Sequence, residues 1–237
     1  MDTPRATRPI PLFLTALVAF FSALVALAVS NGHAHAHGNE PHPASATIVV
    51  AHAPASEARR AVALRTDLRK LWEDHITWTR LAIISLTTGS PDTQATVARL
   101  LRNQTDIGNA VKPFYGQAAG SELTRQLRKH IMIAAEVVAA AKLGDQGKLA
   151  DAQARWTTNG DNIARVLNSV NHSYWKLPAM KAELRTHLRL TTDEAVARIT
   201  GNWGADVAAY DKIHHHAMHL SDLLAAGIVK QFPQRFR

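Results

Sequence analysis

The 237-residue sequence contains no cysteine. It can form no disulfide, no thiolate metal site and no cysteine nucleophile, so any bound metal ion would need nitrogen and oxygen ligands. Glycine is scarce, with 12 residues, and aromatic residues make up only 6% of the chain. Because alanine and leucine are abundant and 46% of the residues are hydrophobic, the composition is typical of a helical globular protein.

Catalytic signatures are missing as well. The sequence has no GxSxG, no P-loop, no HExxH and no GxGxxG opening a helix. We therefore assign no catalytic or cofactor-binding residue, and a metal-dependent enzyme is the least favoured class. The formal net charge is +8, but the basic residues are scattered and form no arginine-rich block, so nucleic-acid binding is not expected.

The N-terminus carries a targeting pattern. Arg5 and Arg8 precede an uncharged apolar run at residues 11–30, and small residues follow it. This order predicts a secretory signal peptide over residues 1–36. Because the run is nearly long enough to span a bilayer, a retained membrane anchor is the alternative. Both interpretations export the rest of the chain, to the periplasm, to the outside or to the outer face of the inner membrane.

The stretch that follows is rich in His, Ala and Pro. We interpret residues 37–55 as a flexible linker between the signal and a domain over residues 56–237. Four of its neighbouring histidines could bind copper or zinc loosely, or serve only as a polar spacer: His33, His35, His37 and His42.

The domain is predicted to be all-α, because apolar residues recur at helical spacing and Gly, Pro and Asp interrupt them. The expected helices cover residues 56–88, 91–114, 121–143, 148–170, 179–200 and 205–232. Taken in pairs, these six helices form three helical hairpins in an up-down bundle.

The first helix of each hairpin contains a similar segment. WEDHITWT, LRKHIMIA and LRTHLRLT each place a histidine on an otherwise apolar face, at His75, His130 and His187. The histidines are 55 and 57 residues apart, a near-constant spacing that indicates an internal repeat. Because the three helices run parallel in an up-down bundle, the histidines are expected to share one buried layer.

The second helix of each hairpin offers an aspartate. Asp106, Asp161 and Asp211 lie about as far beyond the predicted turns as the histidines lie before them. In an antiparallel hairpin, residues equidistant from the turn lie side by side. The sequence therefore predicts three His–Asp pairs at matched height.

Two interpretations of this layer remain open. Three imidazoles with carboxylates suit a divalent transition metal (Zn, Cu, Fe or Mn) or a small ligand, with the aspartates binding the ion or orienting the imidazoles. Alternatively, the pairs only lock the helices of a structural or envelope-associated protein, since a buried His bonded to an Asp satisfies both groups. We expect a non-catalytic binding protein.

The last helix contains a second candidate metal site. Asp211, His215 and His219 are four residues apart and share one stripe of the helix. Two helical histidines at this spacing can hold one ion.

Several phrases of the sequence resemble a group of uncharacterised exported bacterial helical proteins. The phrases are WxxHxxWTR from Trp72, PFYG at residues 113–116, HLxLTxDEAVARxTG at residues 187–201, and Tyr210-Asp211. The resemblance covers roughly residues 65–233. It implies an independent helical domain and no particular activity.

Overall fold

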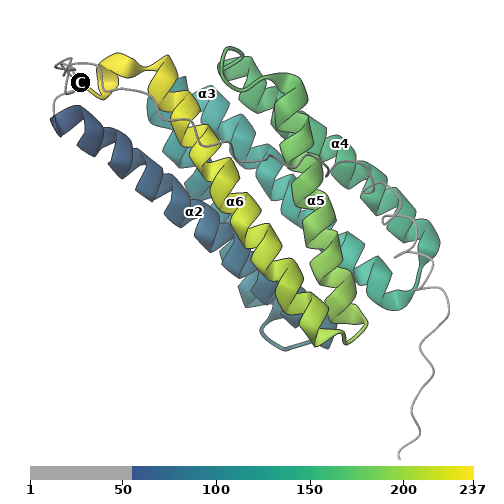
Figure 1. The fold of residues 1–237 in the computed structure, drawn as a ribbon. Coiled ribbons are helices and arrows are strands. Elements are labelled where there is room, and N and C mark those ends of the chain that lie inside the picture. The colour runs from purple at the N-terminus through teal and green to yellow at the C-terminus, as the bar shows by residue number, and fades with distance from the viewer. Residues whose placement is uncertain (1–54) are drawn as a thin grey trace, which may run out of the picture. The chain divides into compact units, whose positions relative to one another are not determined.

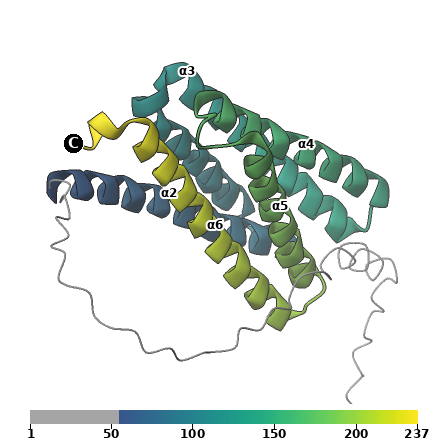
Figure 2. The same cartoon turned by 45° about the horizontal axis from the view of Figure 1, so that its top comes forward.

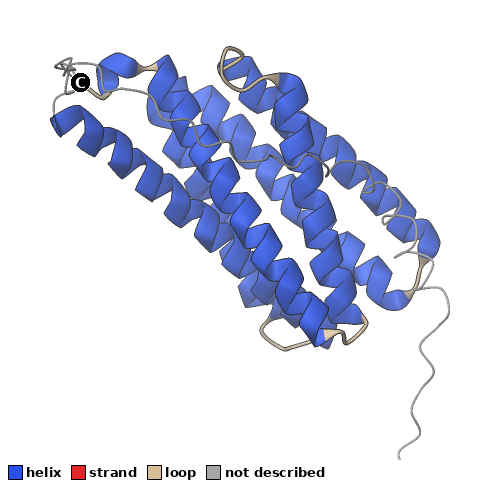
Figure 3. Ribbon diagram, viewed as in Figure 1, coloured by secondary structure: helices blue, strands red, loops and turns tan. Residues whose placement is uncertain are grey.

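The structure, a computed structural model, describes residues 55–237. Within this range the chain is all-helical, as predicted, and has no strand (Figure 3). The elements are α2 (Ala55–Thr88), α3 (Thr93–Leu143), α4 (Gln146–Val170), α5 (Leu177–Ile199), α6 (Trp203–Gln231) and the short 3-10 helix η2 (Pro233–Arg235). The predicted signal segment, and the predicted linker except its last residue, lie outside the described residues.

The helices form a bundle in which each packs against the next in the chain. α6 also packs along α2, so the last helix closes the arrangement onto the first (Figures 1 and 2). None of the helices from residue 55 onward combines the length and hydrophobicity needed to cross a membrane.

Over residues 55–237 the chain has five α-helices where the sequence predicted six. Residues 91–114 and 121–143 were expected to be separate, but both belong to α3, and only Gly116 leaves the helical conformation, with φ 82° and ψ 169°. Glycine adopts a positive φ without steric cost, so one residue bends the helix where a loop was expected. The two parts of α3 on either side of Gly116 approach each other closely. A Cβ on Gly108 would lie only 2.7 Å from the carbonyl oxygen of Gly120.

Polar caps set the turns around which the bundle is built. At the α3–α4 turn Gly144 has φ 70°, and the Asp145 side chain accepts a hydrogen bond from the Lys148 amide at 3.0 Å. At the start of α6, Asn202 accepts one from the Ala205 amide at 3.1 Å. These caps satisfy backbone donors that the helix itself leaves free.

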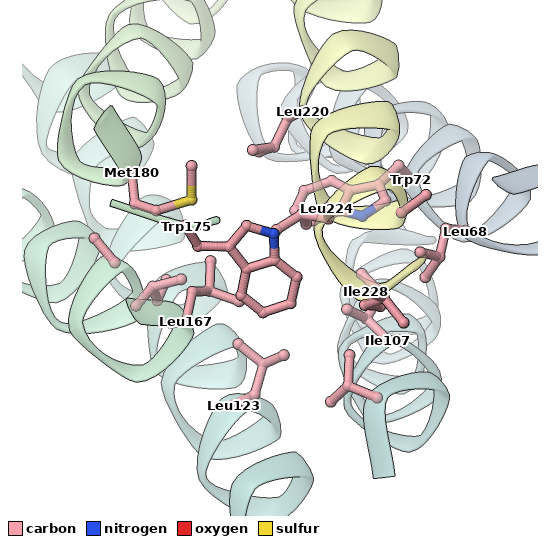
Figure 4. Packing of buried hydrophobic residues seen from close by; sticks show 14 of the residues in the cluster. Leu68, Trp72, Ile107, Leu123, Leu167, Trp175, Met180, Leu220, Leu224 and Ile228 are labelled. Carbon is pink, nitrogen blue, oxygen red and sulfur yellow. The ribbon is translucent and has the colours of Figure 1, made fainter. Parts of the chain in front are cut away.

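The apolar core is organised around Trp175, in the segment between α4 and α5. Its indole is fully buried and lies among leucine and isoleucine side chains from several helices (Figure 4). A Cβ on Gly227 would come within 2.0 Å of Trp175 Nε1, so the indole reaches this position only because residue 227 has no side chain. The break between two helices therefore supplies a central core residue.

Candidate functional site: a buried histidine layer

Three histidines from three helices meet inside the bundle. His75 on α2, His130 on α3 and His187 on α5 are 2%, 3% and 4% exposed. The His187 ring centre lies 5.6 Å from that of His75 and 5.7 Å from that of His130. The predicted shared layer of buried histidines is therefore present, and His187 connects its other two members.

The predicted aspartate partners are wrong. Asp161 forms an ion pair with Lys181 at 2.8 Å and a longer one with Arg185, and these cations lower its pKa. Asp211 is exposed and Asp106 is only half-buried. None of the three aspartates forms a described hydrogen bond or ion pair with a histidine of residues 55–237.

Amide side chains take the place of the aspartates. The Gln104 amide nitrogen lies 3.2 Å from His75 Nδ1, and Asn159 Oδ1 lies 3.1 Å from His130 Nδ1. Both partners are 29 residues after their histidine, whereas Asp106 and Asp161 are 31 residues after it. Two residues turn an α-helix by about 200°, so the predicted aspartates lie on nearly the opposite face.

The residue 29 positions after His187 is His216, and its ring centre lies 6.3 Å from that of His187. Its Nε2 donates to the Glu183 carbonyl oxygen at 3.1 Å. Side-chain amides form the equivalent bond in the other two hairpins: Asn103 donates to the Leu71 carbonyl oxygen, and Asn159 donates to that of Gln126. In all three hairpins the acceptor lies four residues before the layer histidine. The same contact recurs three times, and a search for polar residues 28 or 29 positions after each layer histidine could have found it.

The layer histidines are neutral at pH 7. Burial lowers the pKa of His75 to about 3, and the nearby His130 adds to that shift while Asn103 opposes it. Burial lowers the pKa of His130 to about 4 against a hydrogen bond to Asn159. The pKa of His187 falls well below 6.5 because of burial and its histidine neighbours. Burial dominates because no carboxylate offsets the desolvation of an imidazolium.

The tautomer of His130 follows from its partner. Asn159 Nδ2 donates to the backbone and side-chain oxygens of Gln126, at 3.2 and 3.0 Å, which fixes the orientation of the amide. The Asn159 Oδ1 can then only accept, so His130 Nδ1 carries the proton and donates. The remaining nitrogen of His130, Nε2, holds a free lone pair.

A cavity of about 30 Å³ adjoins the layer. His75, His130 and His187 line it together with apolar residues, among them Trp72 and Trp175. A water molecule needs roughly 10–15 Å³, so the cavity holds about two or three water-sized groups. Several buried polar atoms have no hydrogen-bond partner in the protein: His187 Nδ1, Gln104 Oε1, Trp72 Nε1 and Trp175 Nε1.

The second predicted site, on α6, is arranged differently. Asp211, His215 and His219 are all exposed, so the stripe faces solvent. His219 Nε2 lies 3.7 Å from Glu183 Oε1 on α5. The same carboxylate approaches His216, which lies outside the predicted stripe. As the side chains stand in residues 55–237, no three His, Asp or Glu residues are grouped closely enough to hold a metal ion.

A second polar cluster lies further along the same helices. Arg80 on α2 binds Glu194 at 2.7 Å and Asp206 at 2.9 Å, and Arg198 binds Asp206 at 3.1 Å. The Arg80 guanidinium also stacks on the Tyr210 ring at 4.7 Å. Burial raises the pKa of Glu194 to about 7, although Arg80 opposes this shift. Unlike the layer, this cluster is ionic.

Comparison of the chain with protein-family models, with curated proteins and with solved structures finds no match.

Proposed function

We propose that the chain is an exported, non-catalytic helical-bundle protein that binds one transition-metal ion, zinc or copper, on His75, His130 and His187. The observation that carries the proposal is that three neutral imidazoles from three helices line one cavity. A metal binds the neutral form of histidine, so groups whose pKa lies far below 7 lose no affinity to protons at neutral pH.

The spacing of the rings supports this ligand set. A metal bound at about 2.0–2.1 Å lies about 3.2 Å from the ring centre, so two rings on one ion are about 5.2–5.5 Å apart. The ring centres of His187 and its two neighbours are 5.6 and 5.7 Å apart. Coordination then requires the rings to turn toward a common point, and His75 must exchange the hydrogen bond that its Nδ1 accepts from the Gln104 amide. The bond from His130 Nδ1 to Asn159 is also the type of contact that orients metal-binding histidines.

Cavity size and chemistry narrow the choice of ligand. About 30 Å³ accommodates an ion with one water molecule, but no organic molecule of ordinary size. No carboxylate lines the cavity, so the all-imidazole set favours zinc or copper over manganese, and Asp106, Asp161 and Asp211 are not part of the proposed ligand set.

A structural role for the layer is the alternative, and the amide contacts favour it. Asn159 accepts a hydrogen bond from His130, as a predicted aspartate would, and the Gln104 amide nitrogen donates one to His75 Nδ1. A polar layer of this kind fixes the register of neighbouring helices with no bound ion.

We further propose that the bundle consists of three repeated helical hairpins, with Gly116 joining the first to the second. The recurrence of one contact at Asn103, Asn159 and His216 supports this repeat. Export, by a signal peptide at residues 1–36 or an anchor at residues 11–30, is likewise proposed, from the charge pattern of that segment and the resemblance to exported helical proteins.

Thermal unfolding with and without zinc tests the metal proposal. Ligand at 100 times its Kd stabilises a protein by about 2.7 kcal/mol, which corresponds to a rise in Tm of roughly 5–10 °C for a domain of this size. We expect this rise in the wild type and in the control His215→Ala, whose histidine is exposed. Most of it should be lost in His187→Ala, and a chelator should bring wild type and variant together.

A second variant covers the case in which His187→Ala does not fold. His130→Gln keeps a polar group of similar size in the layer but removes the nitrogen lone pair, so it should fold and lose the zinc-dependent rise. Equal rises in wild type and in the layer variants would contradict metal binding at the layer and leave the structural role.

A further inference from the structure

We propose that Glu183, His216 and His219 form a second metal site at the surface of the bundle, where a divalent cation is captured before it passes to the histidine layer. Only the destination of the ion rests on the function proposed above. Glu183 lies on α5, and the two histidines are three residues apart on α6 and therefore share one face of it.

The three side chains already point at one another. Glu183 Oε2 lies 3.7 Å from His216 Nδ1, and its other oxygen, Oε1, lies 3.7 Å from His219 Nε2. Two ligand atoms on one tetrahedral zinc ion are about 3.3 Å apart. Bringing each histidine nitrogen to this distance from its carboxylate oxygen therefore needs a movement of a few tenths of an ångström, which rotation of the exposed His219 and the partly exposed Glu183 side chains supplies.

The position of the ring proton makes the gap between His216 and Glu183 attractive to a cation. His216 Nε2 donates to the Glu183 carbonyl oxygen at 3.1 Å, so in the neutral ring Nδ1 holds a lone pair. That lone pair faces a carboxylate oxygen with no proton between them. A cation placed there binds both atoms, while the bond from Nε2 to the backbone orients the ring, as is usual for metal-binding histidines.

Burial also keeps His216 neutral, because it lowers the pKa of the ring even though Glu183 opposes the shift. The nearby Arg189 would repel a cation, but it is already paired with Asp193 at 3.0 Å. The site thus offers two imidazoles and one carboxylate, a ligand set that zinc accepts in proteins.

The position of the site suggests a path inward. The side chains of His219, Glu183 and His216 are 60%, 23% and 10% exposed, so they lead from solvent toward the core. Beyond them, His187 is fully buried, and its ring centre lies 6.3 Å from that of His216. Only the His216 ring therefore separates an ion at the surface site from the layer. The Glu183 carboxylate would lower the cost of taking the ion out of water before it moves on to the layer.

Zinc stoichiometry and loading rate test this proposal. All proteins are full-length, with the histidines of residues 31–55 changed to serine so that the tract binds no zinc. Zinc content is measured after gel filtration, and loading of the layer is followed by the loss of free zinc from a chromophoric chelator. The starting protein should bind two zinc ions. Glu183→Gln and His219→Ala should each bind one and load it at least roughly tenfold more slowly.

The control His215→Ala should behave like the starting protein. Full zinc content in both Glu183→Gln and His219→Ala would overturn the surface site. Loss of one ion with unchanged loading of the other would overturn its role in delivery.

The layer variants separate this proposal from the function proposed above. His187→Ala, or His130→Gln if the first does not fold, should lose only the buried ion and keep the one that depends on Glu183. A single zinc ion that is lost only in Glu183→Gln and His219→Ala would support the surface site and refute the layer. A single ion that is lost only in the layer variants would do the reverse.

Discussion

The histidine layer and the Arg80 cluster are both polar groups buried in the same bundle, but they differ in charge. The layer consists of neutral rings beside amides, and burial keeps protons off them. The cluster pairs Glu194 and Asp206 with Arg80. Glu194 lies only seven residues beyond His187 on α5, about two helical turns. A counter-ion within reach therefore favours charge in the cluster, although burial still raises the pKa of Glu194 to about 7.

The difference also sets opposite pH responses. The layer histidines have folded pKa values below the unfolded value, so between pH 6.5 and about 4 only the unfolded chain takes up their protons, and stability falls with pH. Glu194 has a folded pKa above its unfolded value of 4.5. As the pH falls, Glu194 is protonated in the folded chain before it is protonated in the unfolded chain. Its contribution to the stability of the fold is therefore complete below pH 4.5 and is lost as pH rises through 7.

The largest expected effect is acid destabilisation by the layer. At pH 5 His75 and His130 should each cost about 2 kcal/mol relative to pH 7, about 4 kcal/mol together, and His187 should add to this loss, which is a large share of the stability of an ordinary domain. Urea unfolding at pH 7, 6 and 5, with chelator present throughout, measures the loss. Unchanged stability down to pH 5 would contradict neutral, buried histidines.

Removing the counter-ion should destabilise the Arg80 cluster. Arg80→Met leaves Glu194 and Asp206 buried without their shared cation and should cost about 3–5 kcal/mol in urea unfolding. Arg125→Met is the matched control, because Arg125 forms a solvent-exposed pair with Glu122 whose loss should change the stability little. Similar losses in the two variants would mean that the cluster does not carry the charge described.

The amide partners of the layer should matter more than the aspartates first predicted. Asn159→Ala removes three hydrogen bonds to buried groups of His130 and Gln126 and should cost about 1–3 kcal/mol. Asp161→Ala removes only ion pairs near the surface and should cost under about 1 kcal/mol. Chemical unfolding at pH 7 compares the two, and the reverse order would restore the aspartate as the partner.

The smallest effect should come from neutralising Glu194. Between pH 7 and pH 5 its protonation offsets about 2 kcal/mol of the loss caused by the layer. Glu194→Gln should therefore be more acid-sensitive than the wild type by about that amount over this interval. Parallel pH profiles for the two proteins would show that Glu194 stays ionised and that the cluster does not titrate.

The accuracy of the sequence predictions varied from residue to residue. The layer of His75, His130 and His187 followed from apolar spacing and a near-constant interval, because both reflect the height of a residue along a helix. Gly116 was placed in a predicted loop, since the sequence does not reveal that one glycine can bend a helix and let it continue. Trp175 lay in a predicted break, and its central place in the core depends on the space that Gly227 leaves.

The sequence by itself determined the all-helical character of the domain and the burial of three histidines at one level, because both depend on periodicity and counting. Only the tertiary structure decided which side chains face those histidines. A two-residue error moves a position by about 3 Å along a helix but turns it by about 200° around the axis. In the first two hairpins, counting from the turns therefore found the height of the partners, while the packing of the helices selected Gln104 and Asn159 in place of Asp106 and Asp161.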